Sequence, residues 1–559
     1  MTYFHRFCLM AICCLLCTNQ VLSQVCTPTA NQAILKTGGV KADVYNMGLL
    51  WQGNYQMPAP VFPQTVNPSA LYTCGLMVAG KNAAGNLKIA AQVSINRGGV
   101  DFFPGPLDAA GNVTSPTCRN FDKMFGINIG DINEFRASNG RLISDAMKRW
   151  PAKGNPFFRA AAGFDLPNEN FAPFVDVNRD GIYNPENGDY PDFCGDYALW
   201  WVFNDKGNAH TSSKGGTPLG IDVRGMAYGF DKDPFDSTLY YSTIYNYEIA
   251  YKGTEILDSA YVGLWIDPDL GCTEDDYFGC SPSNNLAFVY NSDAADGNGI
   301  GLCSESGKSY GSKVPAVGIK LLQTPKGENG QEVGMTNFMY HHTSSDTTTY
   351  LKKAGWATTP NEYYNYMTSR WRDGSPLTRG GEGTSTTNVA TKYAYPAVPT
   401  DTINWNMPNS RANTVEKAMI ISCGPFKMLP GSRHRLAFAV VADLDAPKHP
   451  RVDMTKLISR ANSLKNVCTF PTAINDIPKS NTTVSVVPNP VSHEAHLIYS
   501  GFINRVSIFN LTGQLMVETN AINTNAFKFS TQNMSAGIYV YRMTDSNGQS
   551  VSGRFTVLK

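Results

Sequence analysis

The sequence has little charge. Lys and Arg together number 46, Asp and Glu also number 46, and charged residues make up only 16% of the 559 residues, against roughly 25% in a typical soluble domain. A net charge of zero gives no long-range attraction for a polyanion, so we expect neither nucleic acid nor an anionic membrane surface as a partner. The polar surface must come from Asn, Ser, Thr, Gly and Tyr, which favours strands joined by turns.

The motifs of several enzyme classes are also missing. There is no HExxH pair for a catalytic zinc, and after residue 23 there is no CxxC pair for a zinc knuckle or a thioredoxin-like site. One GxSxG string occurs at Gly307 to Gly311, but a Gly- and Ser-rich stretch precedes it and Pro315 follows closely. A nucleophile elbow needs a strand before the serine and a helix after it. We therefore assign no catalytic residue and favour a non-enzymatic role.

No apolar run reaches the roughly 20 residues that a membrane helix needs. The longest, Phe7 to Cys17, follows Arg6 and precedes small residues at Val21 and Ser23. This order predicts a signal peptide over residues 1–23, with cleavage after Ser23.

The signal segment holds four of the 13 cysteines, so nine remain in the exported chain. Export makes disulfides possible, and an odd number leaves at least one thiol free or paired between chains. Cys272 and Cys280 are close in sequence and are the expected bridge.

Strand signals prevail over helix signals along most of the chain. Aromatic and β-branched segments alternate with Gly, Pro and Asn turns, the pattern of antiparallel sheets. The clearest segments are residues 87–95, 197–203, 238–251, 259–266, 285–290, 418–422 and 435–442. Two helices are expected, at Arg141 to Trp150 and at Asp453 to Val467, where apolar residues recur at helical spacing.

These segments predict a mainly β fold with few helices. Residues 24–468 should form one or two large antiparallel units of the β-sandwich or jelly-roll type, and a division into two would fall near 230–255. Residues 469–483 contain two Pro and several Ser, Thr and Asn, which indicates a linker. A small C-terminal β-sandwich should then occupy residues 484–559.

Three spaced motifs mark the C-terminal segment. They are Val487-Pro-Asn-Pro490, Val506 to Gly513 and Ser535 to Tyr541, followed by a terminal basic-apolar strand that ends at Lys559. In this order they resemble the type A sorting domain of the bacterial type IX secretion system. An ordinary immunoglobulin-like spacer is the alternative, and the N-terminal export signal favours the sorting domain.

The resemblance implies where the protein goes and what it meets. Residues 484–559 would be read by the outer-membrane translocon and its sorting machinery, and then removed while the cargo is released or attached to surface lipopolysaccharide. The protein would be extracellular or would lie on the outer-membrane cell surface. Lipopolysaccharide and glycans are the further partners considered.

The middle region resembles large exported cargo of the same secretion system, for which no activity is established. The matching stretches are residues 101–107, 176–191, 267–280, 363–367 and 424–431. This resemblance implies export and nothing finer.

One acidic loop has the spacing of a calcium site. Asp176, Asn178 and Asp180 alternate before Gly181, so their oxygens can turn toward one centre, where the Ile182 carbonyl can add a ligand. The twelfth position is Asn rather than Glu, so this is not an EF-hand. Glu186, Asp189 or Asp192 would have to complete the ligand shell. The alternative is an Asx-rich turn without a metal.

A second acidic stretch follows a predicted strand. Asp267, Asp269, Asp275 and Asp276 lie within ten residues, and carboxylates this close repel one another unless they are protonated, solvated or bridged by a cation. We expect a second calcium site here. A solvated loop and a catalytic carboxylate pair are the alternatives.

Two aromatic clusters leave a second function open. Trp200-Trp201, and Tyr363 to Tyr366 with Trp371, could stack on sugar rings or fill the core of the sheets, and we favour the core. The sequence thus predicts an exported structural or adhesive protein with calcium-stabilised loops. A secreted hydrolase or carbohydrate-binding protein is the alternative.

Overall fold

The chain forms two compact units, Met1–Pro471 and Thr472–Lys559, which are considered separately below. The computed structural model describes residues 26–27, 31–57, 68–94, 99–231, 237–273, 275–297, 309–343, 349–410, 416–444, 446, 448–468, 484–510, 514–545 and 550–558. The expected signal peptide and the expected linker lie outside the described residues. No helix in the described part of the chain is long and apolar enough to cross a membrane.

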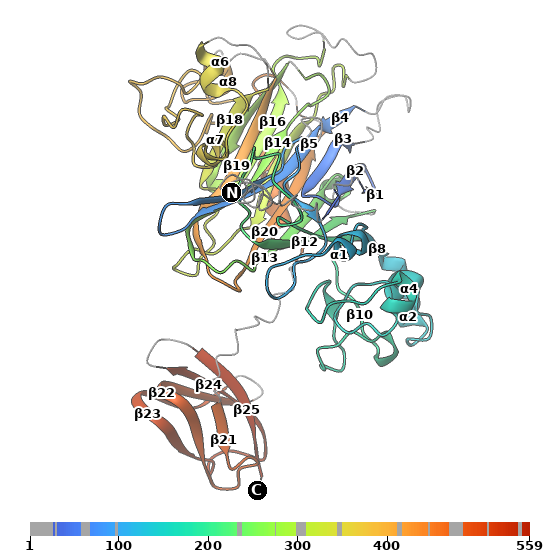
Figure 1. Ribbon diagram of the computed structural model, residues 1–559, viewed down its shortest axis with the longest axis vertical. Coiled ribbons are helices and arrows are strands. Elements are labelled where there is room, and N and C mark those ends of the chain that lie inside the picture. The colour runs from blue at the N-terminus through green and yellow to red at the C-terminus, as the bar shows by residue number, and fades with distance from the viewer. Residues whose placement is uncertain are drawn as a thin grey trace, which may run out of the picture. The chain divides into compact units, whose positions relative to one another are not determined.

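Two nine-stranded antiparallel sheets make up most of the first unit (Figure 1). The first sheet has the order β1 (Gln32–Thr37), β2 (Val40–Tyr45), β3 (Leu49–Gln56), β5 (Thr73–Lys81), β14 (Leu257–Asp267), β19 (Lys417–Met428) and β18 (Asn337–His342), with β4 (Ser69–Leu71) beside β3 and β6 (Leu87–Ala91) beside β5. The second has the order β15 (Asp276–Ser281), β16 (Leu286–Asn291), β17 (Ala316–Gln323), β20 (Arg433–Asp443), β13 (Thr243–Tyr251), β12 (Ile221–Gly229), β11 (Tyr197–Asn204) and β7 (Phe103–Pro104), with β8 (Phe125–Asn128) beside β11.

The two sheets share one hydrophobic core. Trp51 on β3 donates its indole N–H to the Tyr245 hydroxyl on β13 (2.9 Å), so the polar atoms of two large buried rings satisfy each other. Trp201 on β11 is fully buried, and its ring occupies the space where a side chain at Gly225 would lie. This packing confirms the mainly β sandwich that the strand pattern predicts.

Short helices cover the sheets at two places. The side lobe, residues 105–195, contains α1 (Ser115–Asn120), α2 (Ile129–Ala137), α3 (Asp145–Lys148), α4 (Phe158–Ala162), β9 (Phe174–Val175), η2 (Pro185–Asn187) and β10 (Tyr190–Pro191). The cap, residues 349–410, contains α6 (Thr349–Ala354), α7 (Pro360–Met367) and α8 (Met407–Ser410). Figure 1 shows the side lobe in blue-green and the cap in yellow, on different parts of the sandwich. The remaining short elements are α5 (Ser237–Tyr240), η3 (Pro282–Asn284), α9 (Thr455–Ser463) and η4 (Leu464–Asn466).

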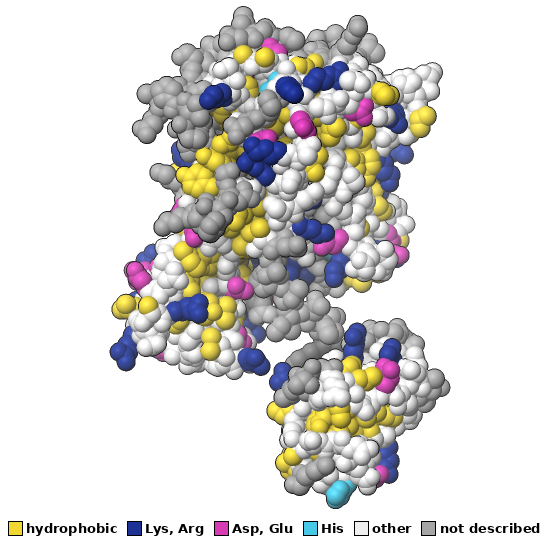
Figure 2. All heavy atoms as spheres, turned by 180° about the vertical axis from the view of Figure 1, so that it is seen from behind, with side chains coloured by type: hydrophobic (Ala, Val, Ile, Leu, Met, Phe, Trp, Pro, Cys, Tyr) yellow, Lys and Arg dark blue, Asp and Glu magenta, His cyan; other side chains and the backbone are white. Residues whose placement is uncertain are grey.

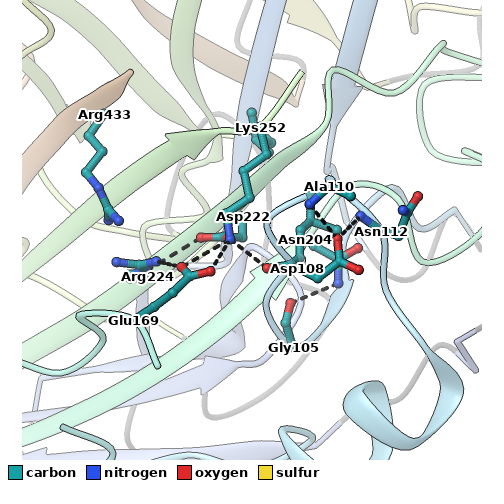
Figure 3. Close-up of polar contacts among 12 residues, drawn as sticks. Gly105, Asp108, Ala110, Asn112, Glu169, Asn204, Asp222, Arg224, Lys252 and Arg433 are labelled. Carbon is teal, nitrogen blue, oxygen red and sulfur yellow. Dashed lines mark hydrogen bonds and ion pairs between the residues drawn. The ribbon is translucent and has the colours of Figure 1, made fainter. Parts of the chain in front are cut away.

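Buried ion pairs connect the side lobe to the second sheet (Figure 3). Glu169 of the lobe pairs with Arg224 on β12 (3.0 Å) and with Lys252 (2.8 Å). Asp222 is fully buried and lies 3.1 Å from the Lys252 ammonium. Across the sheet, Arg224 stands opposite Glu248. Each charged side chain in this network pairs with one of opposite charge. The network therefore fastens the side lobe to the second sheet and is not a binding site.

The second unit has a core of its own. Its five antiparallel strands are β21 (Val484–Val487), β22 (Glu494–Asn510), β23 (Leu515–Ser530), β24 (Gly537–Asp545) and β25 (Ser550–Val557). Inward side chains alternate along β24, where they are Tyr539, Tyr541 and Met543.

Two of three sequence predictions about elements of the first unit need correction. β12 and β13 pair along their whole lengths, from Ile221 opposite Tyr251 to Gly229 opposite Thr243, so no division falls near 230–255. The helix expected over Arg141 to Trp150 is only the single turn α3. The expected helix at Asp453 to Val467 is confirmed as α9 and η4, and its apolar stripe packs on β17 and β20.

The expected bridge between Cys272 and Cys280 is wrong. Cys272 is disulfide-bonded, but Cys280 is a free thiol that points into the core and donates to the Ala394 carbonyl (3.4 Å). Strand β15 turns the Cys280 side chain inward, and the spacing of the two cysteines could not show this. The structure pairs Cys26 with Cys118 and Cys194 with Cys468.

Candidate functional site

Acidic side chains gather at one end of the sandwich. β14 ends at Asp267, and β15 begins at Asp276, which pairs with Asn291 at the end of β16. β19 begins just after Glu416. Antiparallel pairing therefore brings strand ends that are distant in sequence to the same place. We call this set of residues the acidic end: Asp267, Asp269, Asp275, Asp276, Asp296 and Glu416.

Asp275 and Asp296 form the inner group of the acidic end. One carboxylate oxygen of each and the Cys272 sulfur lie within 4.8 Å of one another. Because Cys272 is disulfide-bonded, its sulfur is not a thiolate. The anionic ligands of this group are therefore the carboxylates of Asp275 and Asp296. Backbone N–H groups orient them: Gly297 donates to Asp275 (2.9 Å), and Cys272 donates to Asp296 (2.9 Å).

The carboxylates of Asp275 and Asp276 each have one oxygen without a hydrogen-bond partner. Asp275 is 0% exposed and Asp276 is 9% exposed, and the Oδ1 atom of each is buried without a donor. Burial raises the pKa of Asp275 to about 7, and the Asp296 carboxylate adds to the rise. Burial also raises the pKa of Asp276 well above its usual range, with repulsion from Asp275 adding to the effect. These oxygens need either a proton or a cation.

Asp267, Asp269 and Glu416 form the outer group. One oxygen of each lies within 4.8 Å of the others. Asp267 is buried, whereas Asp269 and Glu416 are half-buried. The charge of Asp269 also contributes to the raised pKa of Asp276, so the two groups influence each other.

Sequence reasoning missed Asp296 and Glu416. Asp296 lies in the turn Asn291-Ser-Asp-Ala-Ala-Asp-Gly297, whose Asx and Gly residues after a strand are a readable turn signal. Glu416 reaches the site only through the pairing of β19 with β14, which joins residues about 150 positions apart in the chain. No local pattern indicates this.

The loop over residues 176–189 holds its shape through its own hydrogen bonds. Asp176 accepts the backbone N–H groups of Arg179 (2.6 Å) and Gly181 (2.8 Å). Asp180 accepts from the Asn178 amide (2.8 Å) and from the backbone N–H of Ile182 (2.8 Å). This is an Asx-rich turn, and its carboxylates do not form a group of three within 4.8 Å. Calcium binding here stays a prediction.

Asp189 differs from the other members of this loop because it is fully buried. Its Oδ1 accepts the N–H of Val177 (2.8 Å), and its Oδ2 accepts the N–H of Asn184 (2.9 Å). Both oxygens therefore anchor the two ends of the loop.

The aromatic clusters belong to the core. Trp200, Trp201 and Trp371 are at most 1% exposed, and Tyr363, Tyr364 and Tyr366 of α7 are all buried. They provide no exposed platform for sugar rings.

A second group of titratable side chains surrounds Glu382. The Tyr340 and Tyr395 hydroxyls both donate to its Oε2, at 2.8 and 3.1 Å. Burial lowers the pKa of Lys417 to about 8 and that of His342 to about 3, and the Glu382 charge partly opposes both shifts. Glu382 is half-buried, whereas Tyr340, Tyr395 and His342 are buried.

Two tryptophans hold the turn that carries Glu382. Gly381 and Gly383, on either side of Glu382, have positive φ angles of 53° and 72°. Trp405 donates its indole N–H to the Gly381 carbonyl (3.0 Å), and Trp371 donates to the Gly383 carbonyl (2.9 Å). The Glu382 carboxylate is thus held in place from both sides.

Comparison with known proteins gives a match for the second unit. Residues 485–557 match the family described as a secretion system C-terminal sorting domain. No curated protein matches the chain.

Two solved structures show partial likeness. CopC from Methylosinus trichosporium OB3b is 23% identical, with a TM-score of 0.11, and the match covers 13% of this chain and 93% of that one. A polysaccharide lyase is 10% identical, with a TM-score of 0.17, and the match covers 60% of this chain and 34% of that one.

The family match agrees with the three motifs of the C-terminal segment and with the separate β unit that they form. The second unit is a secretion sorting domain, and the chain is a cargo protein of the type IX secretion system that is exported to the cell surface or the extracellular space.

Proposed function

We propose that this cargo protein has a structural or adhesive role outside the cell and that bound calcium stabilises its acidic end. The observation that carries the proposal is the pair of buried carboxylate oxygens on Asp275 and Asp276 that have no donor, beside Asp296. Calcium prefers six to eight hard oxygen ligands, and carboxylates, backbone carbonyls and water supply them in proteins.

A cation here would join segments that meet only at this end of the sandwich. It would fix the segment between β14 and β15 to the turn after β16, replacing repulsion between Asp275 and Asp296 by attraction to a common ion. The loop over residues 176–189 is the second proposed calcium site. The protein would then be stiff outside the cell, where calcium is available.

Surface charge fits a structural role better than the capture of a polyanion. In Figure 2, Lys and Arg side chains are interspersed with Asp and Glu over the face shown, without a large area of one sign. This matches the zero net charge of the chain.

Thermal unfolding of the exported chain in calcium and in chelator tests the proposal. Calcium at about 100 times its dissociation constant should add about 2.7 kcal/mol of stability and raise the melting temperature by a few degrees. The variant Asp275→Asn/Asp276→Asn should lose this shift yet stay folded in chelator, because neutral amides do not repel. Asp108→Asn, at an exposed turn, is the matched control. An equal calcium shift in the parent and the double variant would contradict the proposed site.

A secreted hydrolase is the second candidate function. It is favoured by Glu382, a half-buried carboxylate on a hydrogen-bonded turn with two tyrosine hydroxyls, a buried lysine and a buried histidine near it. The burial of Tyr340 and Tyr395 favours a closed network over an open active site. A screen of polysaccharides and peptides for products released by the parent, but not by Glu382→Gln, distinguishes the two functions. If the parent released products and Glu382→Gln did not, the protein would be a hydrolase, and the proposed structural role would be wrong.

A further inference from the structure

The turn after β16 carries two neutral oxygens that the proposed function does not use. Asn291 is 0% exposed and Ser292 is 5% exposed. The Asn291 Oδ1 and the Ser292 Oγ are both buried, and neither has a hydrogen-bond partner in the described part of the chain. A buried oxygen without a donor is destabilising and uncommon in folded proteins. Two of them on adjacent residues therefore point to a group that binds both.

The orientation of the Asn291 amide is fixed by its own donors. Its Nδ2 donates to the Asp293 backbone carbonyl (3.1 Å) and to the Asp293 Oδ1 (3.2 Å). Both of these partners are acceptors, so an amide turned the other way would place oxygen against oxygen. The Asn291 Oδ1 therefore faces away from Asp293 and is an acceptor for another group.

Strand pairing places both residues beside the acidic end. Asn291 stands opposite Asp276 in the ladder between β16 and β15, and opposite residues of a ladder present their side chains on the same face of the sheet. Ser292 donates its backbone N–H to the Asp275 carbonyl (2.8 Å). Each neutral oxygen thus belongs to a residue that neighbours one of the two carboxylates with an unpartnered oxygen.

The turn also closes around Asp275. Ser292 at its start donates to the Asp275 backbone carbonyl, and Gly297 at its end donates to the Asp275 carboxylate (2.9 Å). Asp296, between them, brings a carboxylate oxygen within 4.8 Å of one of Asp275. Carboxylate and amide oxygens only accept hydrogen bonds, so they cannot satisfy one another. One hard cation can be bound by several of them at once.

We propose that the Asn291 amide oxygen and the Ser292 hydroxyl are ligands of the calcium bound at the acidic end. This inference rests on the proposed function and names a further part of its ligand set. Calcium accepts six to eight oxygens, whereas magnesium requires a strict octahedron and keeps several waters. Neutral ligands add oxygens without adding to the repulsion among Asp275, Asp276 and Asp296. Asn291 and Ser292 therefore favour calcium over magnesium.

Calorimetric titration of the exported chain with calcium, and separately with magnesium, tests the inference. Ser292→Ala should weaken calcium binding at least about tenfold, since even residues that only orient metal ligands contribute this much. The ratio of calcium affinity to magnesium affinity should fall as well. In chelator this variant should melt like the parent, because the hydroxyl makes no hydrogen bond within the described residues. Asn291→Ala should lose calcium affinity by a similar factor, but it also removes the donors to Asp293 and should melt below the parent.

Ser422→Ala is the matched control. The Ser422 Oγ is also buried without a hydrogen-bond partner among the described residues. It lies in the middle of β19, opposite Gly263 on β14 and Asn337 on β18, and so away from the acidic end. Ser422→Ala should bind calcium like the parent. If it weakened binding as much as Ser292→Ala does, the effect would come from loss of a buried hydroxyl in general, and the inference would be wrong.

The same titrations separate this inference from the proposed function. If Asp275→Asn/Asp276→Asn abolished calcium binding while Ser292→Ala and Asn291→Ala kept the affinity of the parent, calcium would bind at the acidic end without these two ligands. That result would overturn the inference and leave the proposed function in place. If the parent bound no calcium, the proposed function would be wrong as well.

Discussion

At the scale of single residues, substitution of Asp189 can show whether this residue of the loop over 176–189 has a structural role or a metal-binding role. Its carboxylate is fully buried and accepts two backbone N–H groups, from Val177 and Asn184. Asp189→Ala would leave both part-buried donors without their protein partner, which costs at most about 1–3 kcal/mol for each group because water can reach them in part. We expect a clear loss of stability in urea unfolding, in chelator as well as in calcium.

Asp180→Asn is the comparison for Asp189. Asp180 is exposed, and asparagine keeps the oxygen that accepts from Ile182. The Asp180→Asn variant should be as stable as the parent in chelator, and it should lose only the stability that calcium adds to the parent. If Asp189→Ala lost stability only in calcium, Asp189 would be a ligand rather than an anchor.

The carboxylates show how far the sequence predicts a site. Asp275 and Asp276 were predicted because crowded acids in one short stretch repel, and the structure buries both. Their unpaired oxygens and their partner Asp296 were not predictable, since they depend on how β15 and β16 pair. The alternation of Asp176, Asn178 and Asp180 predicted a turn correctly, but a turn signal does not distinguish a calcium loop from Asx hydrogen bonds.

At the scale of elements, the ion pairs between the side lobe and β12 should be a large contribution to stability. Arg224→Met removes one of the two cations that pair with Glu169 and leaves the fully buried Asp222 with Lys252 alone. Breaking a buried pair on one side costs about 3–5 kcal/mol. We expect a loss of this size in urea unfolding. Arg433→Met, at the more exposed end of the network, should cost about 1 kcal/mol or less.

The same network predicts a pH dependence. Burial alone would raise the pKa of Glu248, but Arg224, Arg433 and Arg435 lower it below 4.5. A lowered pKa in the folded state means that the stabilisation is present above pH 4.5 and is lost as pH falls through the folded value. Arg224→Met should reduce the loss of melting temperature between pH 5 and pH 3. An unchanged acid slope would show that Arg224 does not hold the Glu248 charge.

Elements differ in how well their sequences predicted them. The predicted strands 197–203 and 435–442 appear as β11 and β20 because short, nearly continuous runs of apolar residues suit a strand that is buried on both faces. The stretch Tyr363 to Met367 forms α7 instead of a platform, although Thr359 as a cap and Pro360 in the first turn are readable helix signals. The many aromatic residues in this stretch obscured the start of the helix in the sequence. The order of the strands in each sheet depends on contacts between distant residues and was not predictable.

At the scale of the whole molecule, the two units have separate hydrophobic cores. No residue of the first core belongs to the second. The disulfide between Cys194 and Cys468 ties the last described segment of the first unit back to the residues that precede β11. The first unit should therefore keep its fold when the second is absent, since none of its described core residues would be lost.

Deletion of residues 484–559 tests this separation and the export role together. The family match assigns sorting to these residues, so cells that produce the shortened chain should retain it instead of releasing it or displaying it on their surface. The purified shortened chain should melt within about 2 °C of the first transition of the full chain, because its core is complete. Fractionation of cells with an antibody to the first unit measures the first effect, and calorimetry measures the second. A shortened chain that is folded and still found outside the cell in normal amounts would refute the sorting role, whereas one that is unfolded would refute the independence of the two cores.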